Sequence, residues 1–184
     1  QAALACMTMT APGFALRRPT LLIIGCGDVG MRVLTLLQPR WRVLALTSSG
    51  SRMGALRAAG AVPLLGNLDD PATLGRLGGL ADAVLHLAPP PTEGPGDPRT
   101  ANLAKALARR GSGRPARVVY ASTTGVYGDC GGAWIDETRA LAPATARGQR
   151  RVDAEARLRW AGRALGWRVS LLRVPGIYAL DREG

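Results

Sequence analysis

The sequence predicts an α/β protein built on a doubly wound parallel sheet, and three observations indicate this fold class. Short apolar runs alternate with longer amphipathic segments along nearly the whole chain. The runs TLLIIG and AVLHLA are continuously apolar, which is typical of strands that are covered on both faces of a sheet. Strands that alternate with helices are joined by right-handed crossovers, and such crossovers make the strands parallel.

The first third of the chain predicts three strands and two helices. Residues 20–25 form an apolar run that ends in glycine, and residues 29–38 follow with apolar side chains at helical spacing. Residues 41–47 predict the second strand, and residues 51–60 predict a short helix that a glycine closes. Residues 61–66 predict the third strand.

A helix, a strand and a loop are expected next. Residues 70–79 predict a helix with Asp70 as its N-cap and Pro71 at its first position. Residues 81–88 predict the fourth strand. Residues 89–98 contain five prolines in ten residues, so they predict a loop without regular structure.

The last third repeats the alternation. A helix is expected over residues 100–111, the fifth strand over 117–122, a long helix over 145–165 and the sixth strand over 167–174. Six strands in alternation with helices complete a doubly wound sheet.

One domain is expected. The chain has 184 residues, of which 47% are hydrophobic and 20% charged, and this balance indicates a globular fold. Residues 1–19 predict an irregular N-terminal segment, and residues 20–184 form the domain. The N-terminal segment carries its arginines after its apolar part, the reverse of a signal peptide. No apolar stretch approaches the roughly 20 residues that span a membrane, so we expect no membrane association.

The formal charge of +11 comes almost entirely from arginine. Lys105 is the only lysine among 24 basic residues, and the arginines are scattered, with no run of five like charges. No nucleic-acid-binding motif is present, so we do not expect nucleic acid as the main partner and favour a basic pocket for a phosphorylated ligand. Three cysteines without metal-like spacing and the single His86 predict no metal site, and reduced thiols indicate a cytoplasmic protein. We interpret His86 as a packed core side chain rather than a catalytic one.

The motif GCGDVG at residues 25–30 is G-x-G-x-x-G, and it leaves the first predicted strand and opens the first helix. Gly25 allows a tight turn, Gly27 allows the backbone to approach a pyrophosphate, and Gly30 allows close packing of helix and strand. The helix N-terminus supplies amide donors and a partial positive charge. The motif therefore predicts a dinucleotide-binding Rossmann fold; a strand–helix turn without a ligand is the alternative.

The residues after the second and third strands bear on the choice of cofactor. Thr-Ser-Ser-Gly-Ser-Arg ends at Arg52 and contains no acid that would hold the ribose 2′-hydroxyl of NAD. Ser48 and Arg52, helped by Arg32, favour the 2′-phosphate of NADP over NAD; the alternative is that Arg52 is a solvated helix residue. Asn67 has an amide suited to adenine, with a helix-entry turn as the alternative.

From about residue 20 to the C-terminus the chain resembles the extended short-chain dehydrogenase/reductases, the group that contains nucleotide-sugar epimerases and dehydratases. The motifs that carry the resemblance are GCGDVG, DAVLHLA, RVVYASTTGVYGDCGGAWIDE and LLRVPGIY. The family uses a Ser or Thr, a Tyr and a Lys in catalysis. Anchored on Val-Tyr-Gly, the resemblance places the Ser/Thr on Thr123, beside Ser122 and Thr124.

The resemblance fails at the other two positions, because the family's Tyr falls on Arg147 and its Lys on Arg151. An arginine has no accessible neutral form near pH 7, so it does not act as a base there. Arg151 still offers a positive charge to the nicotinamide ribose. Tyr127 is the nearest other phenol and a candidate acid/base; a structural role is its alternative. The candidate catalytic residues are thus Thr123, Tyr127 and Ser122.

The resemblance implies an atypical NAD(P)-dependent oxidoreductase or epimerase/dehydratase-like enzyme with an unidentified small-molecule substrate; a non-catalytic NADP-binding sensor or regulatory module is the alternative. Family members continue into a substrate-binding lobe, so we expect that lobe to be truncated or absent. They also dimerise through helices corresponding to 100–111 and 145–165, which implies a homodimer. The expected cofactor contacts are Gly25, Gly27, Asp28, Val29, Gly30, Ser48, Arg52, Asn67, Leu68, Ala88 and Arg151.

Overall fold

Six parallel strands form a single sheet in the computed structural model, which describes residues 17–37, 40–109, 115–179 and 181. The strand order is β3-β2-β1-β4-β5-β6, and every neighbouring pair is parallel. This is the order of a doubly wound Rossmann sheet, so the predicted fold class is confirmed. The strands are β1 (Thr20–Ile24), β2 (Arg42–Thr47), β3 (Val62–Leu65), β4 (Ala83–His86), β5 (Arg117–Thr123) and β6 (Arg168–Val174).

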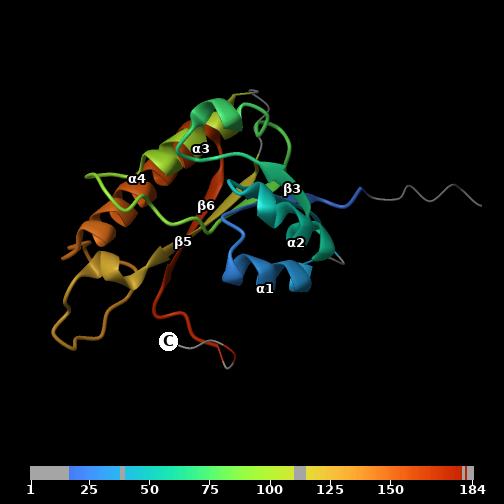
Figure 1. Cartoon of the computed structure of the whole chain (residues 1–184). Coiled ribbons are helices and arrows are strands. Elements are labelled where there is room, and N and C mark those ends of the chain that lie inside the picture. Colours follow the sequence, from blue (N-terminus) through green and yellow to red (C-terminus); the bar gives the residue numbers. More distant parts are fainter. Residues whose placement is uncertain (1–16, 38–39, 110–114, 180, 182–184) are drawn as a thin grey trace, which may run out of the picture.

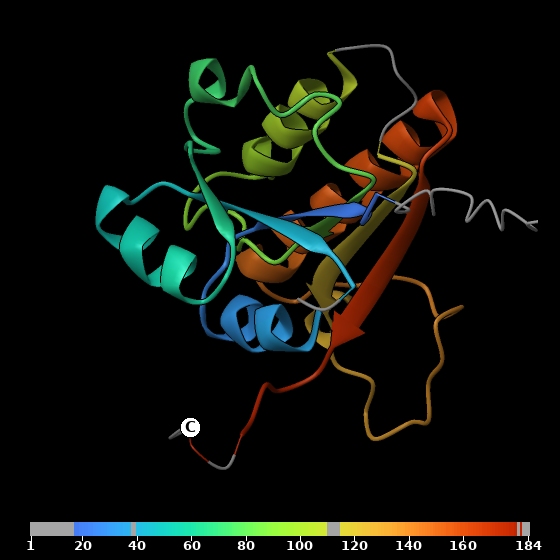
Figure 2. The ribbon, with the colours of Figure 1, turned by 90° about the vertical axis from the view of Figure 1, so that its right-hand side faces the viewer.

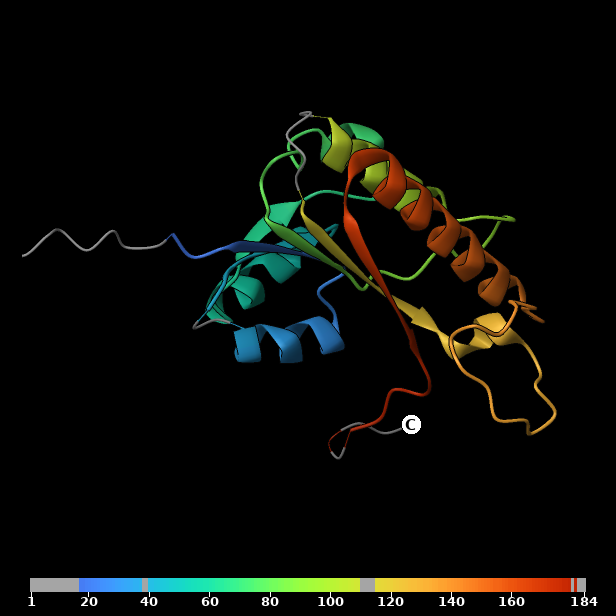
Figure 3. The ribbon, with the colours of Figure 1, turned by 180° about the vertical axis from the view of Figure 1, so that it is seen from behind.

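Helices cover both faces of the sheet (Figure 1). Helices α1 and α2 lie on one face, and α3 and α4 lie side by side on the other, which the view from behind confirms (Figure 3). The α-helices are α1 (Asp28–Leu37), α2 (Met53–Ala58), α3 (Pro98–Ala108) and α4 (Ala146–Leu165), and the 3₁₀ turns are η1 (Gly50–Arg52), η2 (Pro71–Leu74) and η3 (Thr124–Tyr127).

The core divides into two layers because side chains alternate along each strand. Ile23 packs with Leu34 of α1 in one layer, and Ile24 packs with Leu158 of α4 in the other. All four side chains are completely buried. Each such side chain stabilises the fold by about 1.5–3 kcal/mol relative to an exposed one. The continuous apolar run of β1 is therefore explained by burial on both faces.

The helix predicted over residues 70–79 is wrong in length, because only the 3₁₀ turn η2 forms there. Its start is as predicted: Asp70 accepts a hydrogen bond from the Ala72 amide at 3.1 Å. Glycines follow the turn, and Gly79 has a φ of +73°, a left-handed conformation that does not continue a helix.

Helix α3 begins at Pro98, two residues before the predicted start. The Asp97 side chain accepts from the Thr100 amide at 3.1 Å, and Pro98 occupies the first helical position. The other predicted strands and helices agree with the structure to within two residues at each end. The N-terminal segment 1–16, including Cys6, lies outside the described residues. Within the described residues, no helix has the length and apolar character needed to cross a bilayer.

The carboxyl ends of the strands form one edge of the sheet, and β1 and β4 are neighbours there. The chain leaves β1 toward α1 on one face and leaves β4 toward α3 on the other, so a crevice opens between them, as at the switch point of other doubly wound sheets. The segment after β6 turns back toward α1 (Figure 2), where Asp181 lies 2.9 Å from Arg32.

Candidate functional site

The glycine loop between β1 and α1 has three glycines with different surroundings. Gly25 has a φ of +79°, and a Cβ there would lie 2.5 Å from the backbone nitrogen of Ala88. Gly30 faces the Cys26 sulfur, which a Cβ would approach to 3.0 Å. At Gly27, in contrast, a Cβ would meet nothing within 4 Å, so the backbone is open on that side. An open backbone at a helix N-terminus fits the pyrophosphate of a dinucleotide.

A first cavity, of about 300 Å³, adjoins the glycine loop at the ends of β1, β2 and β3. Six of the residues predicted to contact a cofactor line it: Gly25, Ser48, Arg52, Asn67, Leu68 and Ala88. Oδ1 of Asn67 accepts a hydrogen bond from the Asp69 backbone amide at 3.0 Å. This bond holds the Asn67 side chain in a turn at the rim of the cavity. Leu68 is buried.

Arg52 reaches back over the glycine loop. Its Nη2 donates to the carbonyl oxygen of Cys26 at 2.8 Å, which fixes the guanidinium beside this cavity. Arg32 does not join it. The guanidinium of Arg32 is held by Asp28 at 3.1 Å and by Asp181 at 2.9 Å, so the structure does not bring Arg32 to the cavity.

A pair that sequence reasoning missed also lines the first cavity. Arg99 donates two hydrogen bonds of 2.7 Å to the carboxylate of Asp69, and these lower the pKa of Asp69. The partners are 30 positions apart, so no local pattern connects them. The sequence does contain one indication of where Arg99 lies: Asp97 and Pro98 form a helix start, which places Arg99 in the first turn of α3.

A second cavity, of about 710 Å³, lies at the ends of β5 and β6 beside the start of α4. Four residues from the predicted set line it: Val29 of the glycine loop, Ser122, Thr123 and Arg151. The two cavities meet at the end of β4, because Leu87 lines the second and Ala88 the first. Together they extend along the carboxyl edge of the sheet on both sides of the glycine loop.

The three candidate catalytic hydroxyls have different surroundings. The Ser122 hydroxyl donates to the buried carboxylate of Glu155 at 2.6 Å. The Tyr127 hydroxyl accepts from Nη1 of Arg173 at 2.6 Å, and Tyr127 is buried and is not among the residues lining the second cavity. The Thr123 oxygen accepts from the Gly125 amide at 3.2 Å, which leaves its proton to be donated. Of the three, only Thr123 both lines the cavity and keeps a donor for a ligand.

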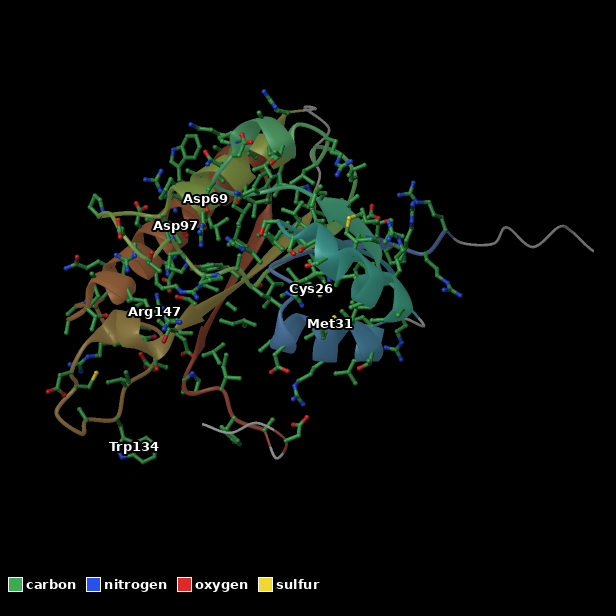
Figure 4. The ribbon with its side chains drawn as sticks, in the orientation of Figure 1. Cys26, Met31, Asp69, Asp97, Trp134 and Arg147 are labelled. Atoms are coloured by element: carbon green, nitrogen blue, oxygen red, sulfur yellow. The ribbon has the colours of Figure 1, made fainter. Side chains whose placement is uncertain are left out.

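Helix α4 places two guanidinium groups at this cavity. Arg147 and Arg151 are four positions apart, hence on one side of the helix, and both line the cavity. Arg151 is buried, and its Nη1 donates to the Tyr120 hydroxyl at 2.8 Å and to the Ala121 carbonyl at 2.7 Å. Arg147 is exposed at the first turn (Figure 4).

His86 is a core residue, as the sequence indicated. It is completely buried, with Nε2 3.0 Å from the Thr100 hydroxyl, which itself donates to Asp97 at 2.7 Å. Because that hydroxyl proton is already given to Asp97, Nε2 of His86 carries the proton of the bond. Burial is the main cause that lowers the pKa of His86 to about 3, with a smaller contribution from Arg151, so the ring is neutral.

Two further features fall outside the site. A hollow of about 760 Å³ lies at the opposite edge of the sheet and is lined by Arg17, Arg18 and Arg42. Ligands of open parallel sheets bind at the carboxyl ends of the strands, so this hollow is not the expected place for a ligand.

Among the described residues, no three His, Cys, Asp or Glu side chains gather in a way that could hold a metal ion.

No protein-family model and no curated protein sequence matches the chain. Solved structures do resemble it. A conserved protein of unknown function from Silicibacter pomeroyi is 34% identical, with a TM-score of 0.68 over 87% of this chain and 53% of its own. A short-chain dehydrogenase/reductase superfamily protein from Agrobacterium tumefaciens with bound NAD is 25% identical, with a TM-score of 0.68 over 84% of this chain and 48% of its own.

A UDP-glucuronic acid 4-epimerase from Bacillus cereus in complex with NAD shares the fold, with 19% identity and a TM-score of 0.68 over 86% of this chain and 57% of its own. The chain thus spans about half the length of these proteins. The strand order and the glycine loop after β1 agree with the same assignment. The chain thus resembles proteins of the short-chain dehydrogenase/reductase superfamily, whose fold it shares.

Proposed function

We propose that this domain binds a nicotinamide dinucleotide and serves an oxidoreductase or epimerase/dehydratase-like reaction. The observation that carries the proposal is the pair of adjoining cavities on either side of the glycine loop. In this arrangement the adenosine lies in the first cavity beside Asn67 and Leu68, and the pyrophosphate lies at Gly27. The nicotinamide ribose lies in the second cavity beside Arg151.

NADP is the proposed cofactor, with NAD as the alternative. Arg52 and Ser48 line the first cavity, and the stretch that follows β2 has no acid to hold a ribose 2′-hydroxyl. A guanidinium forms charge-assisted hydrogen bonds with a phosphate, which supports a contact between Arg52 and the 2′-phosphate. The Agrobacterium and Bacillus structures contain NAD, so the preference for NADP is a property proposed for this chain.

The reaction we propose is hydride transfer at a carbon that bears a carbonyl or hydroxyl oxygen, with the accompanying proton exchanged between that oxygen and water in the second cavity. A nicotinamide ring supplies or accepts the hydride when it is bound. Thr123 donates a hydrogen bond to the reacting oxygen, since it lines the second cavity and its proton is not used within the described structure. Ser122 already gives its proton to Glu155, and Tyr127 does not line the cavity, so we assign them supporting roles.

A second candidate function is a non-catalytic NADP sensor or regulatory module. The specific observation that favours it is Arg147, which stands where the resemblance to the family expects the tyrosine acid/base. Arginine does not exchange a proton near pH 7, so binding without turnover is the expected behaviour of such a module.

Titration of the purified chain with NADPH and NADH by calorimetry tests the cofactor proposal. We expect NADPH to bind more tightly, and Arg52→Ala to weaken NADPH by about tenfold or more while NADH changes little. Arg57→Ala is the matched control, because Arg57 is an exposed arginine of α2 that lies away from both cavities. Failure of both dinucleotides to bind would contradict the proposed function.

A screen of carbonyl substrates with NADPH separates the enzyme from the sensor. Substrate-dependent oxidation of NADPH that Thr123→Ala lowers and Tyr127→Phe leaves largely intact would support the enzyme. NADPH binding without turnover for any substrate would support the sensor.

A homodimer and a cytoplasmic location are parts of the same proposal. The outer surfaces of α3 and α4 form a shallow groove between Ala101, Ala104 and Ala156, with Trp160 at its side. Trp160 is 66% exposed, which is a large apolar surface to leave in water. A second copy of this helix pair is the proposed partner.

A further inference from the structure

The second cavity carries positive charge that nothing nearby cancels. Arg147 and Arg151 line it, and its lining contains no aspartate or glutamate. Two acids follow them on α4: Asp153 is paired with Arg157, and Glu155 is completely buried and paired with Arg159 and Arg173. The two arginines of the cavity therefore lack a compensating carboxylate at the cavity wall.

Arg147 is free to bind a ligand. It is exposed, and within the described residues it has no hydrogen bond or ion pair. It occupies the first turn of α4, whose N-cap Thr145 and whose buried Gly148 also line the cavity. The helix N-terminus adds a partial positive charge to that of the guanidinium.

Arg151 is held in place and remains only partly satisfied. It is more than nine-tenths buried, and both of its hydrogen bonds run through Nη1, to Tyr120 and Ala121. Its Nε is buried without any partner, and its guanidinium lies 5.3 Å from the centre of the Tyr120 ring. Nη2 of Arg151 also donates no hydrogen bond among the described residues, so an acceptor in the cavity can pair with this edge of the guanidinium.

We propose that the second cavity binds an oxyanion of the substrate, a carboxylate or a phosphate group, with Arg147 pairing it directly and Arg151 lying between the anion and the nicotinamide ribose. The hydroxyls of Thr123 and Thr124 line the same cavity and supply neutral donors beside the charged ones. The chemical class of substrate is thus an acid whose anionic group lies close to the reacting carbon. This assignment rests on the proposed function in one respect, namely that the cavity is where substrate and nicotinamide meet.

The charge also explains how a site without a tyrosine can select its substrate. A planar guanidinium fork pairs with a carboxylate or phosphate through two parallel hydrogen bonds, which fixes the orientation of the bound molecule. A neutral sugar or ketone of similar size offers no such pairing. Discrimination in favour of acidic substrates is therefore the expected consequence of Arg147.

Calorimetric titration of the whole chain with malonate, inorganic phosphate and the uncharged malonamide tests the proposal. We expect malonate or phosphate to bind and malonamide not to bind; whichever anion binds more tightly identifies the group. Arg147→Ala should weaken that anion by about tenfold or more, and Arg147→Lys should weaken it less. Arg163→Ala removes an equal charge from the exposed last turn of α4 and should have little effect.

Three results would overturn the proposal: no anion binds, malonamide binds equally well, or Arg163→Ala weakens the anion as much as Arg147→Ala does. A titration of the same proteins with NADH separates this inference from the proposed function. Anion binding with no NADH binding would refute the dinucleotide proposal alone. NADH binding that phosphate displaces would assign Arg147 to the cofactor and refute the substrate site. Because Arg147 is exposed, urea unfolding of Arg147→Ala should match that of the unmodified chain.

Discussion

The carboxylate of Glu155 accepts a hydrogen bond from Nη2 of Arg173 at 2.8 Å, and this buried pair joins helix α4 to strand β6. Glu155 also accepts from the Ser122 hydroxyl at 2.6 Å and from Arg159 at 3.1 Å. Nη1 of Arg173 continues to the Tyr127 hydroxyl. The pair therefore fixes the hydroxyl of Ser122, which lines the second cavity, and that of Tyr127, which does not.

Removal of Arg173 should destabilise the fold strongly. Arg173→Met leaves the completely buried Glu155 without its nearest charge partner, and breaking such a pair costs about 3–5 kcal/mol. The side chain of Arg159 is 44% exposed, so Arg159→Met should cost less than about 1 kcal/mol. Urea unfolding of both variants measures the difference. If both variants lost the same free energy of unfolding, the Glu155–Arg173 ion pair would contribute no more to stability than the Glu155–Arg159 pair.

The two loop glycines should separate stability from ligand binding. Gly25→Ala places a side chain at a φ of +79° and against the Ala88 backbone, so we expect a marked loss of thermal stability. Gly27→Ala meets no protein atom, so the fold should persist, while the added methyl group blocks a pyrophosphate. Thermal melts and NADPH titrations of both variants check this. A Gly27→Ala variant that binds NADPH normally would place the pyrophosphate elsewhere.

Stability should fall with acid because of His86. Its pKa of about 3 in the folded state lies below the ordinary value of 6.5, so the unfolded chain takes up the proton first. The stabilising contribution is fully present above pH 6.5 and is lost as the pH falls toward 3. With about 1.4 kcal/mol per pH unit, the loss between pH 6.5 and 4.5 should be about 2–3 kcal/mol.

Urea unfolding at several pH values measures this loss. His86 is the only histidine of the chain, so its share of the change between pH 6.5 and 4.5 is the part that a substitution at this position removes. His86→Gln keeps an amide donor for Thr100 and should flatten the curve over the same range. A curve that His86→Gln leaves unchanged would assign the titration to another group.

The α3–α4 surface should govern the oligomeric state. Analytical ultracentrifugation of the chain should show a dimer, and Trp160→Glu should convert it to a monomer, because a charge in an apolar interface is costly. Trp134→Glu is the matched control: Trp134 is fully exposed at the tip of the loop after η3 (Figure 4), and its change should leave the dimer intact. A monomeric unmodified chain would contradict the proposed dimer.

The sequence by itself determined the class of fold and the position of the glycine loop. A local pattern is enough to predict the buried strands, the amphipathic helices and the glycine needed at position 25, because each depends on only a few neighbouring residues. The overlong helix expected over residues 70–79 shows the limit of that pattern, since helical spacing continued into a stretch where glycines end the turn.

The tertiary structure alone decided which side chains are available at the site. Ser122 is paired with Glu155 from 33 positions away, and Tyr127 with Arg173 from 46 positions away. These partners meet because β5 and β6 are neighbours in the sheet and α4 lies over them. Hydrogen-bond partners depend on which ends of strands and helices come together, and that is a property of the whole packed sheet, which no short stretch of sequence contains.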